Sequence, residues 1–267
     1  MKGKYILGID VGNTNTVFGL FSDTNEGDII HHWRTSTQRD RTSDEMGVFL
    51  ISFLNSASIA VSDVVGFIYS SVVPSFNPLL EKMTFDYFDR TAIKINHKMV
   101  PLKIKYPNPS EIGADRLVNA VAANSLYGND LIVIDMGTAT TFCVLTDSEY
   151  RGGIIAPGLN LSMEALTRNT AQLPSVIFAK PDSGVIGDST VHAMQSGFFY
   201  GWVGMLEGII NEIKKSIPDK DFKVISTGGF AALIDKEFPE LFDEVDSLLT
   251  LKGLRLIYFG PYVDRHA

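Results

Sequence analysis

A polar segment occurs twice in the chain, and this repeat constrains the fold more than any other feature. The first copy reads Asp-Val-Gly-Asn-Thr-Asn-Thr from Asp10, and the second reads Asp-Met-Gly-Thr-Ala-Thr-Thr from Asp135. Each copy follows an apolar run and precedes another, which is the pattern of two buried strands joined by a tight turn. The offset is close to half of the chain, so we interpret the repeat as an internal duplication of one domain. The aligned pairs are Asp10 with Asp135, Gly12 with Gly137 and Thr16 with Thr141.

The residues of both turns are suited to binding phosphate. A Gly-containing turn between strands offers backbone N–H groups, and its Thr and Asn side chains add further donors. Asp10 cannot hold an anion directly, because two unit charges about 4 Å apart repel by roughly 4 kcal/mol at an effective dielectric near 20. It therefore requires a metal ion or an ordered water between itself and the phosphate. A single Asp-x-Gly turn can be a plain hairpin, but two copies favour a nucleotide held in a cleft between two halves.

Further segments carry a resemblance to a known family. The paired hairpins are similar to the two phosphate motifs of the actin/hexokinase/Hsp70 superfamily, and residues 223–230 are similar to its adenosine motif. Within that superfamily, type III pantothenate kinases are the family that the chain resembles, through six segments in order: DVGNTNTVFG, SVVP, NPSEIGADR, DMGTATTF, GGIIAPG and GDSTVHAMQSG. The resemblance implies an α/β fold of two duplicated ribonuclease-H-like (actin-like ATPase) domains with a cleft between them.

Patterns along the chain place the elements of these two halves. Thr42 and Glu45 form a capping box before an apolar 3.6-residue period, which predicts a helix over residues 42–54. A long helical region is predicted from Asp188 to Ile217, and residues 248–259 are predicted as a turn and a strand. The domain boundary is placed at the Gly128 turn, which gives an N-terminal half, residues 1–128, and a C-terminal half, residues 129–267.

Composition bounds the class of protein. With 45% hydrophobic and 20% charged residues the chain is typical of a soluble globular protein. The net charge of −8 argues against nucleic-acid binding, which depends on Lys and Arg. No apolar run approaches membrane-spanning length. The single cysteine, Cys143, excludes an intrachain disulfide and is predicted to lie in the core, so we expect a cytoplasmic protein without membrane contact.

Two groups of residues are assigned to the nucleotide and its cations. Neither a P-loop nor a Rossmann fingerprint occurs in the sequence, so the hairpins carry this assignment. The resemblance implies ATP with Mg²⁺, and a monovalent cation, K⁺ or NH₄⁺, bound with the help of Asp135. The ATP-binding candidates are Asp10, Val11, Gly12, Asn13, Thr14, Asn15, Thr16, Val17 and Thr138.

Residues 113–116, Gly-Ala-Asp-Arg, stand at a predicted helix start and have two interpretations. In the first, Asp115 only complements the helix dipole and Arg116 is solvated. In the second, Asp115 accepts a hydrogen bond from a substrate hydroxyl, while Arg116 and the backbone N–H groups of Gly113 and Ala114 hold the substrate. The resemblance assigns the catalytic base to Asp115.

The remaining substrate-binding candidates, Tyr106 and Thr190, rest on the resemblance. Gly197, Gly201 and Gly204 recur at helical spacing, and this face is a candidate dimer contact, although core packing explains it equally well. We expect a homodimer in which the partner chain completes the substrate pocket.

The sequence therefore predicts an ATP-dependent kinase that phosphorylates pantothenate to 4'-phosphopantothenate, the first step of coenzyme A biosynthesis. Two alternatives stay open. One is a kinase for another small hydroxy or carboxylic acid, and the other is a non-enzymatic transcription accessory factor of the same family. Intact Asp10, Asp115 and Asp135 argue against the second.

Overall fold

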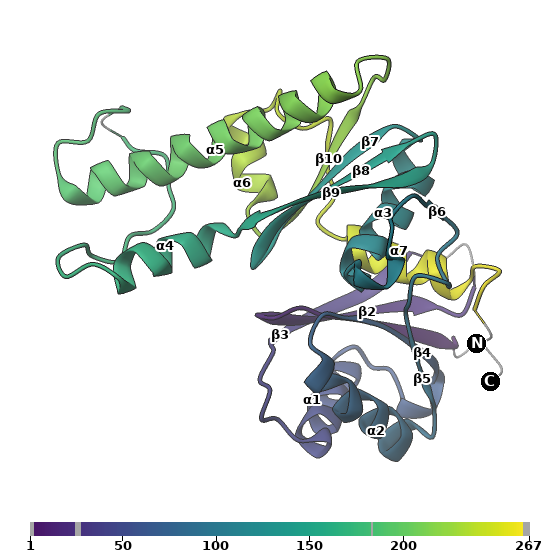
Figure 1. The fold of residues 1–267 in the computed structure, drawn as a ribbon. Helices are drawn as coiled ribbons and strands as arrows, with labels where there is room; N and C mark the ends of the chain where they lie inside the picture. The colour runs from purple at the N-terminus through teal and green to yellow at the C-terminus, as the bar shows by residue number, and fades with distance from the viewer. Residues whose placement is uncertain (1–2, 25–27, 183, 264–267) are drawn as a thin grey trace. The chain divides into compact units, whose positions relative to one another are not determined.

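The computed structural model describes residues 3–24, 28–182 and 184–263, and the chain forms two compact units (Figure 1). The first unit combines Met1–Leu126 with Leu248–Ala267, and the second is Tyr127–Ser247. The predicted division at residue 128 differs from this one at the C-terminal segment, which returns to the first unit.

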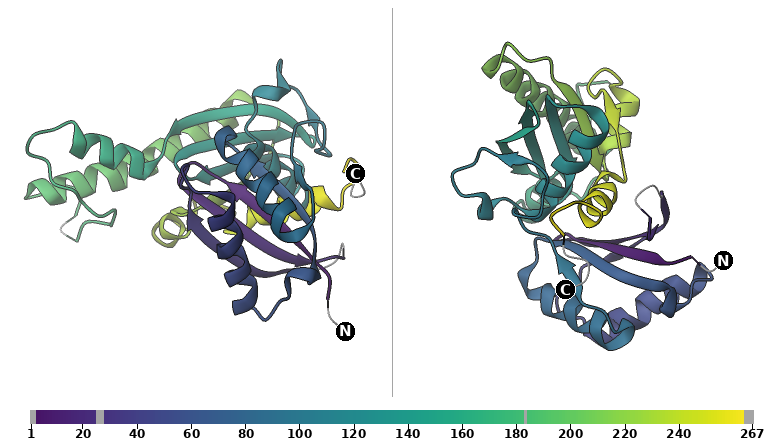
Figure 2. Two further views of the ribbon diagram at one scale, coloured as in Figure 1. Left: turned by 90° about the horizontal axis from the view of Figure 1, so that it is seen from below. Right: turned by 90° about the vertical axis from the view of Figure 1, so that its right-hand side faces the viewer.

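The first unit is a mixed sheet covered by helices on both faces (Figures 1 and 2). The strands of this sheet are β1 (Tyr5–Val11), β2 (Asn15–Ser22), β3 (Ile29–Ser36), β4 (Val64–Ser71) and β5 (Ala92–Lys94). The short β6 (Lys103–Ile104) also belongs to this part of the chain but is not a strand of the sheet. The helices of the unit are α1 (Ser43–Ser56), α2 (Asn77–Phe88), α3 (Ala114–Tyr127, ending at the unit boundary) and α7 (Leu249–Tyr258). Short 3₁₀ turns occupy Val61–Asp63, Pro74–Phe76 and Pro109–Glu111.

The second unit repeats the same strand plan and contains the longest described helix, with 27 residues. Its strands are β7 (Leu131–Met136), β8 (Ala139–Thr146), β9 (Glu149–Pro157), β10 (Lys223–Gly228) and β11 (Glu244–Val245). Its helices are α4 (Leu159–Arg168), α5 (Thr190–Ser216) and α6 (Ala231–Glu237). Helices α4 and α5 run together as an arm that projects beyond the sheet of this unit (Figures 1 and 2).

Strand order supports the duplication. The first sheet runs β3-β2-β1-β4-β5, and the strands of the second unit run β9-β8-β7-β10-β11. In both, the first three strands form an antiparallel meander and the later two pair in parallel. The equivalent strands are β1 and β7, each of which leads into one of the Asp-x-Gly turns.

Each sheet packs its own apolar core. In the first unit Leu7 and Ile9 of β1 share a core with Met46 and Leu50 of α1 and with Leu80 of α2. In the second, Ile132, Ile134 and Phe142 pack under Phe199 and Leu206 of α5. Cys143 is buried, as predicted.

Helix α1 begins as the sequence predicts. The backbone N–H of Glu45 donates to the hydroxyl of Thr42 at 3.2 Å, and the N–H of Thr42 donates back to the Glu45 carboxylate at 2.7 Å. This capping box satisfies two N–H groups that a helix start would otherwise leave without partners.

The prediction of a strand over residues 248–259 is wrong, because this segment forms helix α7. The helix packs on the face of the first sheet opposite α1, where glycines leave space for it. A Cβ at Gly19 would lie 2.9 Å from the Leu251 side chain, and one at Gly66 would lie 2.2 Å from the Tyr258 hydroxyl. A larger residue at either position forces the facing α7 side chain to shift.

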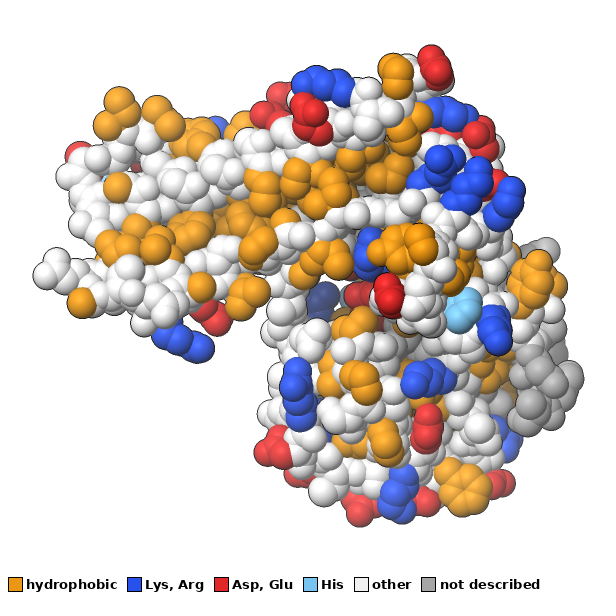
Figure 3. All heavy atoms as spheres, in the orientation of Figure 1, with side chains coloured by type: hydrophobic (Ala, Val, Ile, Leu, Met, Phe, Trp, Pro, Cys, Tyr) orange, Lys and Arg blue, Asp and Glu red, His pale blue; other side chains and the backbone are white. Residues whose placement is uncertain are grey.

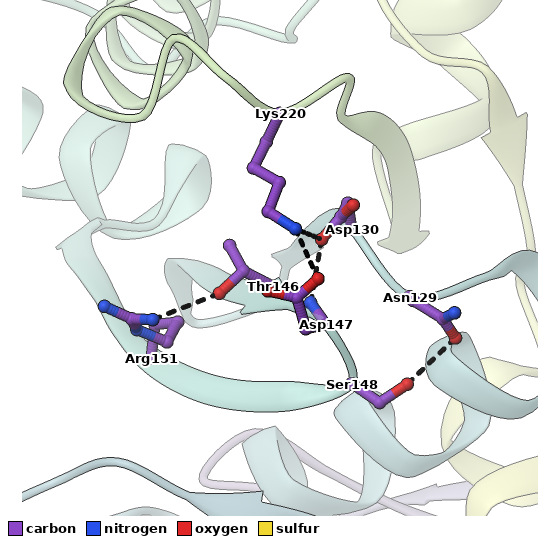
Figure 4. A network of polar contacts seen from close by, with 7 residues as sticks. All are labelled: Asn129, Asp130, Thr146, Asp147, Ser148, Arg151 and Lys220. Carbon is purple, nitrogen blue, oxygen red and sulfur yellow. Dashed lines mark hydrogen bonds and ion pairs between the residues drawn. The ribbon is translucent and has the colours of Figure 1, made fainter.

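A polar network closes the end of the second sheet that lies away from its Asp-x-Gly turn (Figure 4). Asp147 and Ser148 both have positive φ, 53° and 60°, in the turn between β8 and β9. Lys220 pairs with Asp147 and, at 3.4 Å, with Asp130, and the Ser148 hydroxyl donates to Asn129 at 2.8 Å. These contacts hold the turn against the segment that leads into β7.

Across the described ranges, no helix is both long and apolar enough to pass through a bilayer.

Candidate active site

The first hairpin turn, residues 12–14, lies between β1 and β2 and is closed by a hydrogen bond from the Gly12 N–H to the Asn15 carbonyl at 3.0 Å. Of the predicted ATP-binding residues, Val11 and Thr16 are buried and hold the strand ends. Asp10, Gly12 and Val17 are half-buried, whereas Asn13, Thr14 and Asn15 are exposed. The polar tip of the turn is therefore accessible to a ligand while its base is fixed in the sheet.

Thr37, which the sequence analysis did not single out, fixes the shape of this turn. Its N–H donates to the Thr14 carbonyl at 2.9 Å, and its hydroxyl donates to the Gly12 carbonyl at 2.8 Å. The Thr16 hydroxyl lies 2.9 Å from the Thr37 hydroxyl and must be the donor, since the Thr37 proton is already used. The turn is thus held at three points from the end of β3.

A basic side chain also reaches the turn. A guanidinium nitrogen of Arg39 donates to the Asn13 side-chain oxygen at 3.1 Å, and both residues are exposed. This places one positive charge beside a turn whose chemistry suits an anion.

Asp10 stands next to last in β1 and receives a hydrogen bond across the sheet. Its register partner on the parallel strand β4 is Ser70, and the Ser70 hydroxyl donates to Oδ1 of Asp10. Ser70 has 0% exposure, so the donor comes from the interior of the sheet.

The start of α3 lies against the same end of the first sheet. A Cβ at Gly113 would lie 3.6 Å from the Val72 side chain, and the N–H of Val72 donates to the Val11 carbonyl at 3.0 Å. The predicted substrate group of Gly113, Ala114, Asp115 and Arg116 is therefore beside the strand end that carries Asp10.

Gly113 allows Asp115 to fold back over the helix start. A Cβ at Gly113 would lie only 2.5 Å from Oδ1 of Asp115, so a larger residue displaces the carboxylate. The same oxygen accepts the N–H of Arg116 at 2.8 Å. Arg116 is buried, with 9% exposure, which rules out the interpretation that it is solvated.

Burial raises the pKa of Asp115 above its ordinary value of 3.8. Three smaller effects oppose this rise: the hydrogen bond from the Arg116 backbone N–H, the charge of the Arg116 guanidinium and the hydrogen bond from the backbone N–H of Asp115 itself. Desolvation disfavours the charged form, so this carboxylate binds a proton more readily than an exposed aspartate. A raised pKa is characteristic of carboxylates that exchange protons with a substrate.

The second hairpin has a shorter turn, residues 137 and 138, and exposes Thr138 at its tip. The Gly137 N–H donates to the Ala139 carbonyl at 3.1 Å, and Asp135 is half-buried next to the end of β7. The alignment of Thr16 with Thr141 is wrong in register. Val11 pairs with Thr16 whereas Met136 pairs with Thr140, because the second turn is one residue shorter. Thr140 is the structural counterpart of Thr16, and both are buried.

The other two candidates, Tyr106 and Thr190, lie outside the two hairpins. Tyr106 is half-buried in the irregular segment after β6. Thr190 is exposed at the first residue of α5, after the Ser189 cap, and lines a cavity with Leu166 and Met194 on the projecting arm. Within its unit, Thr190 is therefore not brought to Asp135 or Thr138.

Sequence reasoning missed Thr37, Arg39 and Ser70. Arg39 and Thr37 follow the strand that pairs with the hairpin, and their proximity could have been inferred from a three-stranded meander. Ser70 had no local signal, since only the β1–β4 register brings it to Asp10.

Two half-buried carboxylates, those of Asp10 and Asp135, are available to a metal ion. Among the described residues, no group of three or more His, Cys, Asp or Glu side chains is arranged to hold a metal. Single carboxylates such as Asp10 and Asp135 suit a cation that takes its other ligands from phosphate and water, as Mg²⁺ commonly does.

These features fit phosphoryl transfer to a hydroxyl. That reaction needs a phosphate cradle, cations and a carboxylate that orients the acceptor, and little covalent chemistry from the protein. The first unit supplies a polar turn, a held cation in Arg39 and a carboxylate with a raised pKa; the second supplies another turn.

Comparison with known proteins agrees with this chemistry. The family model described as type III pantothenate kinase matches residues 6–212. Proteins named type III pantothenate kinase from Halalkalibacterium halodurans and Geobacillus kaustophilus are each 47% identical; the alignments cover 95% of this chain and 98% and 96% of theirs.

Solved structures with low sequence identity support the fold alone. A putative Baf family transcriptional activator from Campylobacter jejuni aligns with a TM-score of 0.54 at 20% identity, over 94% of this chain and 96% of that one. An activator of 2-hydroxyisocaproyl-CoA dehydratase from Clostridium difficile, solved with bound ADPNP, aligns with a TM-score of 0.52 at 12% identity, over 94% and 91%. The predicted fold class, α/β with two actin-like halves, is confirmed. From the family match and the 47% identity over nearly the whole length, the chain belongs to the type III pantothenate kinase family.

Proposed function

We propose that this protein transfers a phosphoryl group from ATP to the primary hydroxyl of pantothenate and forms 4'-phosphopantothenate, the first step of coenzyme A biosynthesis. The observation that carries the proposal is the placement of Asp115. Its carboxylate is held at the start of α3 beside the end of β1, in a chain 47% identical to proteins that bear this kinase name.

Each candidate takes one part of the reaction. Asp115 accepts the proton of the attacking hydroxyl, and its raised pKa makes it a better base than an exposed aspartate. Arg116 and the N–H groups at Gly113 and Ala114 orient the substrate, with Tyr106 and Thr190 as further contacts. The phosphates of ATP are held by residues 10–17 of the first hairpin and by Thr138 of the second.

Divalent metal enters with the nucleotide in this proposal. Asp10 is the residue that would hold Mg²⁺, through an oxygen or a bound water, and the metal would neutralise charge on the transferring phosphoryl group. The protein itself fixes the turn through Thr37, donates a hydrogen bond from Ser70 to the Asp10 carboxylate and supplies Arg39 as a second positive charge.

A monovalent cation, K⁺ or NH₄⁺, completes the second hairpin. The half-buried carboxylate of Asp135 stands two residues before the Gly137 turn, where it repels any phosphate that Thr138 binds. We expect activity to fall at least tenfold when K⁺ is replaced by a bulky organic cation at constant Mg²⁺ and ionic strength. Full activity without K⁺ or NH₄⁺ contradicts this part of the proposal. If either ion restores activity, a titration with each one shows which is preferred.

The protein acts as a homodimer through the α4–α5 arm. A Cβ at Gly197, Gly201 or Gly204 would meet no atom within 4 Å, so this face of α5 is open along its length. Exposed apolar side chains gather over the same arm (Figure 3), among them Leu161, Leu166, Ile177, Ile186 and Val191. In the dimer, the α5 helices of the two protomers approach closely at these glycines and cover the apolar surface. Thr190 of one protomer then contacts the substrate bound to its partner.

Gly201→Glu tests the dimer. The open face leaves room for the side chain within one protomer, so the variant is expected to fold, to sediment as a monomer and to lose most of its activity. Lys214→Glu is the control, since it is exposed on the same helix about 100° away from the glycine face. A monomeric wild-type protein with full activity rejects the dimer.

Cellular context follows from the substrates. The protein works in the cytoplasm, where ATP is available and thiols such as that of Cys143 stay reduced. The proposal includes no nucleic-acid or membrane partner, and the net charge of −8 argues against nucleic-acid binding.

The proposed function is tested by ATP consumption over a panel of small hydroxy and carboxylic acids, with the product identified by mass spectrometry. We expect pantothenate to give the highest kcat/KM and a product heavier by one phosphoryl group. A faster reaction with another acid favours the alternative kinase. Turnover of none of them would leave the non-enzymatic alternative.

A further inference from the structure

We propose that Ser70 is a positioning residue for Asp10: its buried hydroxyl fixes the carboxylate in the orientation that binds the metal–nucleotide complex. This inference deepens the proposed function and rests on the role given there to Asp10.

The sheet geometry sets up the contact. Strands β1 and β4 pair in parallel, and Asp10 and Ser70 are register partners, so their side chains project on the same side of the sheet. The Ser70 hydroxyl donates to Oδ1 of Asp10. A serine hydroxyl has a single proton to donate, so this contact uses it fully.

Burial makes the contact difficult to replace. Ser70 is 0% exposed, while Asp10 is half-buried at the strand end. Without the hydroxyl, water cannot easily enter the sheet to serve as donor, and the carboxylate loses a fixed partner on its inner side. Hydrogen bonds to an ionised acceptor are stronger than neutral ones, which makes this one an effective restraint on the rotation of the carboxylate.

The second unit repeats the arrangement. There β7 and β10 pair in parallel, and the register partner of Asp135 is Thr227, which is 3% exposed. A buried hydroxyl residue therefore stands beside the aspartate of each phosphate hairpin, in both copies of the duplicated fold. Ser70 and Thr227 share a hydroxyl on Cβ and differ only by the methyl group of threonine.

The test measures binding rather than turnover. A non-hydrolysable β,γ-imido analogue of ATP is titrated by calorimetry with and without MgCl₂ into the wild type, Ser70→Ala, Ser70→Thr and Ser70→Cys. Ser71→Ala is the matched control: it removes a hydroxyl from the next residue of β4, which bonds only to the backbone of Val73 in the described contacts. Asp10→Asn reports the role of the carboxylate itself.

Loss of a group that orients a metal-binding carboxylate typically costs 10–100-fold in affinity. We expect Ser70→Ala to weaken analogue binding by about this factor with Mg²⁺ and by much less without it. Ser70→Thr, which copies the residue of the second unit, should bind within about threefold of the wild type. Ser70→Cys fills the same space but donates a hydrogen bond only weakly, so its affinity should be as low as that of Ser70→Ala. It therefore tests the hydrogen bond even if the alanine variant folds poorly.

Two results overturn the inference. One is wild-type binding by both Ser70→Ala and Ser70→Cys, and the other is an equal loss with and without Mg²⁺, which indicates general disruption. If Asp10→Asn binds the analogue as the wild type does, the nucleotide role of Asp10 itself fails. If Asp10→Asn is impaired and the Ser70 variants are not, only the positioning role is wrong.

Discussion

Replacing Asp115 by asparagine is expected to lower kcat by about 10²–10³-fold while the KM for ATP changes little. Asparagine keeps the shape of the side chain but cannot take the proton of the acceptor hydroxyl. The loose transition state of phosphoryl transfer places the effect towards the lower end of the range for general-base removal. Steady-state kinetics with both substrates varied give the measurement. Glu111→Gln is the control, because Glu111 is an exposed carboxylate just before the same helix.

The pH profile provides a second readout for the same residue. Burial raises the pKa of Asp115, so the carboxylate is protonated, and inactive as a base, at a higher pH than an ordinary aspartate. Activity should therefore fall on the acid side through this raised pKa and recover as the pH rises above it. Asp115→Asn should abolish that limb. Wild-type turnover by the variant with a collapse of pantothenate binding would make Asp115 a binding group and not a base.

Gly228→Ala is expected to destabilise the protein by about 2–5 kcal/mol, from backbone strain plus steric overlap. Gly228 has φ of 95°, a conformation that side chains oppose. Its added Cβ would lie 2.6 Å from the backbone N and O of Met136, the residue before the second phosphate turn. Thermal denaturation should show a decrease in Tm of roughly 5–15 °C, and nucleotide binding should weaken because the turn is displaced.

Gly229→Ala is a closely matched control. It is the next residue, it belongs to the same Gly-Gly sequence, and a Cβ there would meet no atom within 4 Å. Its Tm should stay close to that of the wild type. Equal losses of stability in the two variants would mean that the Gly-Gly segment acts through flexibility and not through the close approach at Gly228.

Local patterns predicted the fold where they agree with tertiary packing. The capping box of Thr42 and Glu45 is formed within a few residues, so its sequence was sufficient. Helix α7 was missed because Leu-Thr-Leu-Lys-Gly-Leu-Arg-Leu, from Leu249, alternates apolar and polar residues as a strand does. Its Gly253 also disfavours a helix in isolation. In the fold, a Cβ at Gly253 would lie 2.2 Å from the Val118 carbonyl, so this glycine permits close packing against α3.

The site shows the same division. The two hairpins were predictable because each is formed by a few consecutive residues. The role of the Gly-Ala-Asp-Arg segment came from the resemblance and stays a prediction. The contact of Ser70 was not predictable, since the register of β1 and β4 brings it to Asp10 from a distant part of the chain. The position of Thr37 beside the turn follows from the three-stranded meander, but the residue itself carries no local signal. The register difference between Thr16 and Thr141 depends on the length of one turn, which an alignment without gaps cannot represent.

The return of α7 to the first unit has a consequence for biosynthesis. A ribosome releases the chain from the N-terminus, so β1, β2 and β4 emerge long before the helix that packs over Gly19 and Gly66. The second unit, by contrast, is continuous in sequence and has all its strands as soon as residue 247 has emerged. The N-terminal sheet must wait with one face uncovered until residue 258 has emerged, and a chaperone that shields apolar surface would have most to protect in the half of the protein that is made first.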